Sequence, residues 1–330
     1  MQFELSEEQA ELAATVRGLL DKRADSAAVR TASASETGYD EALWATLCAQ
    51  IGVAALAVPE EYDGVGASFF ETAVVLEELG RTLAPSPLLA TTVATEALLA
   101  GGTEDAKKRL LPGIAAGQIA TVALDDGAVL DGDRAEIVLA VRGGDLVEVT
   151  GARATWVESM DQSIRLARLD LSGAELSVIG DGDAARSRAE LVGAAAVAAL
   201  AVGLSDRALQ MTVGYLKERV QFGRPIGSFQ ALKHRMADVL ARVEMSRSAS
   251  WAACYALADP GSAPDEAAFL THCAASYALE TASLAASECV QLHGGIAITW
   301  EHDAHLVFKR AHALGQLSGA PHRHRAAVEL

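Results

Sequence analysis

Apolar positions between Ser6 and about Gly117 recur with the period of α-helices. Ser6 begins a capping box, and the residues after it place one apolar stripe on a helix: Leu12, Val16, Leu19 and Leu20. Asp40 is in position to cap a second helix that ends at Gly52, and Ser68 with Glu71 opens a third. Two more helical segments are predicted, one ending at residue 99 and one over 103–116. Residues 1–117 therefore predict a helical N-terminal domain.

The period shortens to that of β-strands over residues 118–182. Four short apolar runs separated by Gly, Asp and Ser predict strands at 119–124, 137–141, 146–149 and 163–171. From residue 183 to 330 the helical period returns in segments at 184–219, 229–258 and 264–292, each long enough for a multi-helix bundle. The predicted fold is mainly α, with a small β middle domain between two helical blocks.

Composition narrows the class of protein. Hydrophobic residues make up 51% of the 330 positions, enough for a large core, while a net charge of −17 disfavours nucleic acid or an anionic membrane as a partner. The start of the chain shows no basic or apolar signal region, and apolar stretches such as 193–202 are too short to span a bilayer, so we expect a cytoplasmic protein. Four widely spaced cysteines indicate reduced thiols: Cys48, Cys254, Cys273 and Cys289.

The most specific motif covers residues 217–230, Lys-Glu-Arg-Val-Gln-Phe-Gly-Arg-Pro-Ile-Gly-Ser-Phe-Gln. It predicts a helix that ends near Arg219, a Gly/Pro loop, and a new helix capped by Ser228. Free backbone N–H groups beside a guanidinium suit a pyrophosphate. Spacing alone favours the alternative, an ordinary connection between two helices.

A second motif follows the last long helical segment, where Gln291-Leu292-His293 precedes Gly294 and Gly295. A Gly-Gly pair permits close approach of the backbone to a ligand. In isolation, a helix C-cap explains the pair better.

Taken together, the R-x-x-F-G-x-P-I-x-x-F-Q and Q-x-x-G-G runs resemble the C-terminal bundle of the acyl-CoA dehydrogenase family. The resemblance extends over nearly the whole chain, including the P-E-E-Y-x-G-x-G loop at 59–66 and Leu111-Pro112. It implies a helical N-terminal domain, a β middle domain, a C-terminal four-helix bundle, and FAD lying across a subunit interface. The role of holding the ADP part of FAD falls on Arg219, Gln221, Phe222, Phe229, Gln230, Gln291, Leu292, Gly294 and Gly295.

The chain departs from this family where a carboxylate base is needed to remove a proton from an acyl-CoA thioester. Family members place a Glu either in a C-terminal Y-E-G-T loop, where this chain has Ser318, or on the first bundle helix, where it has Gly193. Glu190 lies nearly one turn before Gly193 and is a candidate for a displaced base, although a solvated carboxylate is the favoured interpretation. The flavin-side T-E-x-x-x-G-S-D motif is absent from residues 125–133.

This chain thus lacks both flavin-side elements, the carboxylate base and the T-E-x-x-x-G-S-D motif, but keeps the ADP-side motifs. In this respect it resembles the non-catalytic subunit of the paired α2β2 enzymes of actinobacterial sterol degradation. The resemblance implies a homologous catalytic subunit, an acyl-CoA substrate and an electron-transfer flavoprotein as partners, and no catalytic residue in this chain. Two alternatives stay open: a homomeric dehydrogenase using Glu190, and a flavin-free scaffold. A metal site at His302 and His305 is disfavoured because the spacing matches no known motif. Trp300 is assigned to packing.

Overall fold

The N-terminal helical domain forms as its caps predict. The computed structural model describes residues 4–328. The Ser6 hydroxyl accepts from the Gln9 N–H at 3.2 Å, and the Asp40 carboxylate accepts from the Leu43 N–H at 2.9 Å. The helices of this domain are α1 (Glu7–Arg23), α2 (Ser26–Ala34), α3 (Glu41–Thr46), α4 (Phe69–Thr82), α5 (Leu88–Gly101) and α6 (Glu104–Ala115), with short turns at Leu47–Ile51 and Glu60–Tyr62.

The middle domain contains two small sheets. One has the order β1-β3-β4-β7, from β1 (Ala120–Ala123), β3 (Ile137–Arg142), β4 (Asp145–Thr150) and β7 (Glu175–Asp181). The other has the order β2-β6-β5, from β2 (Val129–Leu130), β5 (Arg153–Val157) and β6 (Leu166–Asp170). The four predicted strands are present as β1, β3, β4 and β6, whereas β2, β5 and β7 were not predicted.

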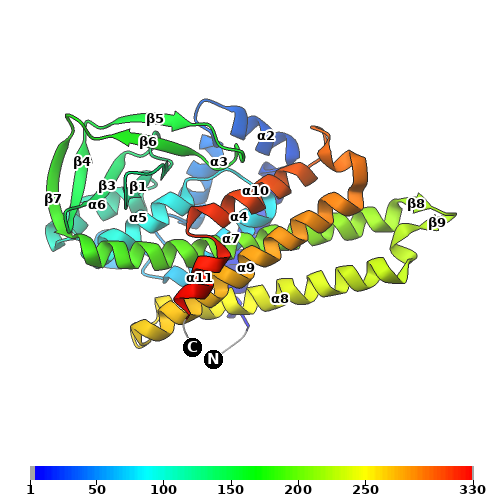
Figure 1. Cartoon of the computed structure of the whole chain (residues 1–330). Helices are drawn as coiled ribbons and strands as arrows, with labels where there is room; N and C mark the ends of the chain where they lie inside the picture. Colours follow the sequence, from blue (N-terminus) through cyan, green and yellow to red (C-terminus); the bar gives the residue numbers. More distant parts are fainter. Residues whose placement is uncertain (1–3, 329–330) are drawn as a thin grey trace.

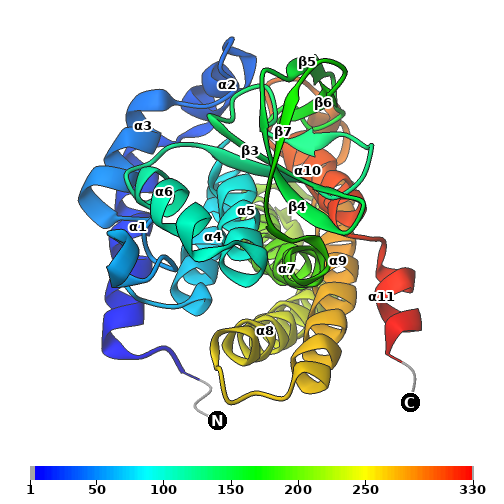
Figure 2. The same cartoon turned by 90° about the vertical axis from the view of Figure 1, so that its left-hand side faces the viewer.

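The C-terminal bundle is built around α7 (Gly182–Glu218), which packs against α4, α5, α8 (Gln230–Ala258) and α9 (Pro264–His293). The chain then passes through a 3₁₀ turn (Gly294–Ile298) into α10 (Ala304–Leu317) and α11 (Pro321–Ala327). Figure 2 shows α7, α8 and α9 nearly end-on, with the middle domain above α7 and the N-terminal helices to one side. The mainly α fold with a β middle domain is confirmed.

Glycine permits α4 and α7 to cross at close range. A β-carbon on Gly203 would lie 1.9 Å from the Glu77 carbonyl oxygen, and one on Gly80 would lie 2.2 Å from the Leu200 carbonyl oxygen. Any side chain at either position would separate the two helices. This crossing fixes the N-terminal domain against the bundle.

Helix α7 has an 18-residue window with a mean hydropathy of 1.6, long and apolar enough to cross a membrane by length and composition. The expectation that residues 193–202 are too short was wrong, because they belong to a helix of 37 residues. The window is 89% buried inside the protein. Its composition is therefore explained by its position at the centre of the bundle.

Candidate functional site

Arg219 ends α7 and begins the R-x-x-F-G hairpin, whose short strands are β8 (Val220–Gln221) and β9 (Arg224–Pro225). Its backbone N–H donates to the Tyr215 carbonyl at 2.9 Å, and its own carbonyl accepts from the Ile226 N–H at 2.8 Å. The hairpin projects beyond one end of the bundle (Figure 1). The exposed Arg219 guanidinium forms no ion pair or hydrogen bond within residues 4–328. It is therefore free to bind an anion.

Phe222 lies at the tip of this hairpin with φ +52° and 90% of its surface exposed. Its ring meets the Phe229 ring edge-on at 6.0 Å, and the Arg224 guanidinium lies 4.1 Å from the centre of the Phe229 ring. A left-handed backbone and an exposed phenyl ring both cost free energy in a lone chain. Such a combination is typical of a binding surface.

The predicted cap of the next helix was wrong. Ile226–Ser228 forms a 3₁₀ turn, and α8 begins after Phe229, which provides no side-chain cap. The turn is closed by the Phe229 N–H donating to the Ile226 carbonyl at 3.1 Å, so Ser228 belongs to the turn and not to the helix end. Gln221 and Gln230, on either side of this turn, are both exposed.

The Gly-Gly pair is both a C-cap and an open surface. Helix α9 ends at His293, and Gly294 has φ +66° and ψ −146°, a conformation that favours glycine. Its N–H donates to the Val290 carbonyl, as the C-cap interpretation predicts. A β-carbon on Gly294 or Gly295 would meet no atom within 4 Å. Gln291 is exposed and Leu292 half-buried beside them.

The two motifs lie at the same end of the bundle, because α7 and α9 pack together and the Tyr215 and His293 rings stack at 4.5 Å. We call this region, residues 219–230 and 291–295, the cofactor end. Large apolar side chains are also exposed in or near it: Val220 at 53%, Ile298 at 77% and Trp300 at 62%. The assignment of Trp300 to packing was therefore wrong. Its ring is covered only in part, by Lys309 and a stacked His305.

A second candidate region, the cleft, lies toward the other end of α7. It has a volume of about 880 Å³ and is walled by α5, β1, the 125–128 loop, the first turns of α7, and residues 316–324. Gly193 and Ser318, the two positions to which the family resemblance assigns the base, both line it. The 125–128 loop, where the resemblance expects the flavin-side motif, is exposed, and Asp125 there accepts from the Gly127 N–H at 2.6 Å.

Glu190 also lines the cleft, but at a solvated edge. Its side chain is 58% exposed and lies 3.5 Å from the Arg186 guanidinium. Within the described part of the chain, the other carboxylate that lines the cleft is Asp125, which is exposed too. The cleft therefore has no buried carboxylate from residues 4–328, the environment that would tune a base for work near neutral pH.

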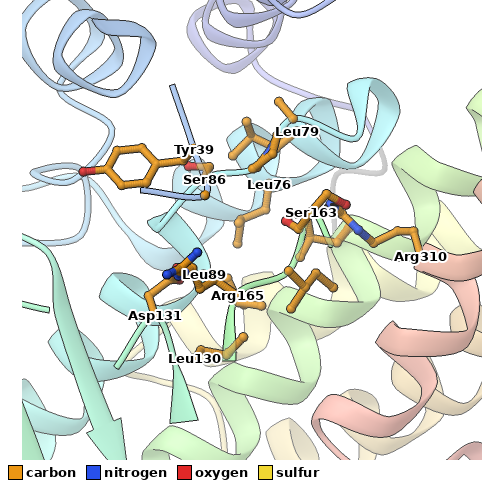
Figure 3. A pocket seen from close by; sticks show the side chains of 15 residues that line it. Tyr39, Leu76, Leu79, Ser86, Leu89, Leu130, Asp131, Ser163, Arg165 and Arg310 are labelled. Atoms are coloured by element: carbon orange, nitrogen blue, oxygen red, sulfur yellow. Dashed lines mark hydrogen bonds between the residues drawn. The ribbon is translucent and has the colours of Figure 1, made fainter. Parts of the chain in front are cut away.

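Sequence reasoning missed a buried carboxyl between the N-terminal and middle domains. Asp131 lines a cavity of about 40 Å³ together with Tyr39 and Arg165 (Figure 3). Burial, together with the nearby Asp133 carboxylate, raises the pKa of Asp131 to about 7. Arg165 is occupied by Asp133, 2.6 Å away, so its charge compensates Asp131 only in part. No motif marks this residue in the sequence.

Two parts of the chain match known protein-family models. The model of the acyl-CoA dehydrogenase N-terminal domain matches residues 6–118, and that of the C-terminal domain matches residues 183–329. The chain belongs to the acyl-CoA dehydrogenase family, as its motifs predict. The cofactor of this family is FAD.

Individual relatives refine the comparison. Acyl-CoA dehydrogenase IpdE2 of Mycobacterium tuberculosis is 48% identical over 96% of this chain and 94% of its own length, and IpdE2 of Mycolicibacterium smegmatis is 44% identical over 98% and 99%. Among solved structures, the ChsE4-ChsE5 complex from Mycobacterium tuberculosis superposes with a TM-score of 0.88 at 25% identity, covering 99% of this chain and 98% of the other. A Tcur3481-Tcur3483 steroid ACAD variant also gives 0.88, at 28% identity over 98% and 96%.

The cofactor end fits the ADP part of FAD by its own chemistry. The Arg219 guanidinium, which has no partner in the described part of the chain, suits the pyrophosphate charge, and the open backbone at Gly294 and Gly295 allows a ligand to approach. An exposed phenyl ring offers an apolar surface for a base. The residues assigned from the sequence are thus brought together at one end of the bundle.

Proposed function

We propose that this chain is a subunit of a FAD-dependent acyl-CoA dehydrogenase that holds the ADP part of a FAD whose flavin ring lies in a partner subunit. One observation carries the proposal. Gly193, in the cleft, and Glu218, beside the hairpin, lie roughly 38 Å apart along α7 at 1.5 Å per residue. An extended dinucleotide does not reach that far, so FAD bound at the cofactor end places its flavin outside the cleft of this chain.

The proposed roles follow from the contacts described. Arg219 neutralises the pyrophosphate, while Gln221 and Gln291 offer exposed amides for hydrogen bonds at either side of it. The exposed Phe222 ring and the half-buried Phe229 ring become buried when a partner covers them, which favours assembly. When bound, FAD supplies the acceptor for the hydride that leaves an acyl-CoA during α,β-desaturation.

We further propose that the partner supplies the base, because the two carboxylates that line the cleft within residues 4–328, Asp125 and Glu190, are both exposed. A homologous partner is supported by the ChsE4-ChsE5 complex, in which two named chains assemble. The steroid dehydrogenase among the structural neighbours supports an acyl-CoA with a sterol-derived acyl group as substrate. An electron-transfer flavoprotein is the acceptor that we propose for the reduced cofactor.

One alternative has a specific observation in its favour. Glu190 does line the cleft, so a homomeric dehydrogenase that uses it as base is the second candidate. A flavin-free scaffold is the third, and it predicts no bound flavin under any condition.

Co-expression separates these candidates. The chain would be purified alone and together with a homologous chain that carries the family's Glu, and flavin content and acyl-CoA oxidation would be measured for both. We expect little flavin and no oxidation from the chain alone, and a yellow, active complex from the pair. Oxidation by the lone chain would support the Glu190 enzyme, and a colourless pair would support the scaffold.

A further inference from the structure

We propose that Tyr215 and His293 are positioning residues of the cofactor end. Their stacked rings hold the R-x-x-F-G hairpin and the Gly294–Gly295 turn in one fixed relation, so that both contact the same dinucleotide. The inference rests on the proposed function and extends it to two residues that act through their neighbours.

Each ring is coupled directly to one of the motifs. Tyr215 lies on the last turn of α7, and its carbonyl accepts the Arg219 N–H at 2.9 Å. His293 is the last residue of α9 and directly precedes Gly294. The two ring centres are 4.5 Å apart with an angle of 30° between the planes, a stacked pair. A shift of either motif would therefore have to break this pair.

His293 contacts a second ring as well. The His302 ring lies 4.6 Å away at 54°. The His293 Nδ1–H donates to the Cys289 carbonyl at 2.7 Å, while His302 accepts the Ala304 N–H at its Nδ1, 3.1 Å away. Burial lowers the pKa of His293, which keeps its ring neutral at neutral pH. Two neighbouring rings and one backbone hydrogen bond thus restrain the His293 ring, and the hydrogen bond selects its Nδ1–H tautomer.

The turn needs such support because its glycines contribute none. A side chain at either glycine would meet nothing within 4 Å, and glycine has the most backbone freedom to lose on binding. At the far end of the segment 294–303, the Asp303 carboxylate accepts hydrogen bonds from two side chains of α2, Ser26 at 2.5 Å and Arg30 at 2.8 Å. The stack of Tyr215 on His293 restrains the other end of this segment, where the two glycines lie. Preorganisation of this kind raises affinity by reducing the ordering cost of binding.

The test compares aromatic with aliphatic replacements in the co-expressed complex. We expect Tyr215→Leu and His293→Leu to weaken FAD binding by about tenfold, since each removes an aromatic pair. Tyr215→Phe and His293→Phe keep a ring in place and should restore affinity to within about twofold of the parent. FAD dissociation constants would come from flavin fluorescence, and amide hydrogen exchange over residues 294–303 should become faster only in the Leu variants.

Each outcome decides the question. Leu variants that bind FAD as tightly as the parent would overturn the positioning role, and so would Phe variants as weak as the Leu variants. If His293→Leu prevents assembly, the test rests on Tyr215→Leu, which removes the same ring pair at a residue that is only half-buried. Unchanged FAD affinity in Arg219→Ala would show that the proposed cofactor site itself is wrong. Loss of FAD from Arg219→Ala alone would overturn only the positioning role.

Discussion

The hydroxyl oxygen of Ser318 lies 3.4 Å from the point that a β-carbon on Gly193 would occupy. These residues are 125 positions apart in the chain, on α7 and just after α10. They are the two positions to which the family resemblance assigns the base, so the two assigned positions lie together in the cleft. Here those positions hold a hydroxyl facing a glycine. A hydroxyl without its own base is a poor proton acceptor at neutral pH.

Gly193 is not required by packing, and this can be tested on α7 itself. A β-carbon at Gly193 would make only ordinary contacts, with Ser318 at 3.4 Å and Val93 at 3.8 Å. Gly193→Ala should therefore raise the melting temperature of the complex by about 1–2 °C, through reduced entropy of the unfolded chain. Gly203→Ala is the matched control, because its β-carbon would overlap the Glu77 carbonyl. It should lower the melting temperature by about 4 °C or more. A destabilising Gly193→Ala would contradict this account.

Removal of the Arg219 guanidinium should release FAD. A charge-assisted contact with a phosphate contributes roughly 1.5–3 kcal/mol, so Arg219→Ala should weaken FAD binding in the complex by about tenfold or more. Arg23→Ala removes the same charge from the exposed end of α1 and serves as the control. Flavin content after gel filtration and a fluorescence titration would measure both. Equal flavin retention in the two variants would count against the cofactor assignment.

Asp131 predicts a pH-dependent change in stability. Its folded-state pKa of about 7 lies above the ordinary value of 3.8, so the folded chain holds the proton more tightly than the unfolded chain. Stability should therefore decrease as pH rises from about 4 to about 7, and the loss persists above pH 7. Asp131→Asn removes this titration and tolerates the residue's φ of +51°. It should raise the melting temperature by about 2 °C or more at pH 8, and by less at pH 5. An equal effect at both pH values would contradict the raised pKa.

Local signals in the sequence predicted local structure well. The caps at Ser6, Asp40 and Ser68 depend on residues three positions away, and all three form. Strands were missed where apolar residues do not mark a buried face. In β7, Leu176 and Val178 are exposed at the sheet edge, and β5 is exposed or half-buried throughout, so neither gives the expected pattern. Helix α2 was missed because its Ala- and Ser-rich sequence has no long apolar side chain except Val29.

The candidate site was predictable only as separate pieces. The two motifs identified the residues of the cofactor end, but the stack between Tyr215 and His293 depends on how α7 packs against α9. The raised pKa of Asp131 likewise depends on burial between two domains. Distances of this kind result from tertiary packing, which no pattern along the chain records.

The sharpest prediction concerns Glu190, the carboxylate of this chain nearest in sequence to a base position. Its side chain is 58% exposed and lies beside Arg186, so water and a guanidinium already stabilise its charge. A base needs a site that excludes water and brings its pKa toward neutrality, and a positioned base contributes a rate factor of about 10²–10⁴. Glu190→Gln in the complex should leave turnover within about threefold of the parent, or roughly 0.7 kcal/mol in barrier.

The control is the Glu of the partner subunit, whose replacement by Gln should abolish turnover while flavin stays bound. Steady-state oxidation of an acyl-CoA, with flavin content measured for each complex, gives both results in one experiment. Loss of the ion pair with Arg186 is the other effect of Glu190→Gln, and an exposed i,i+4 pair contributes only about 0.3–0.5 kcal/mol. A change in assembly therefore should not obscure the result. A hundredfold loss of turnover in Glu190→Gln, at full flavin content, would place the base in this chain, because neither solvation nor stability accounts for a loss of that size.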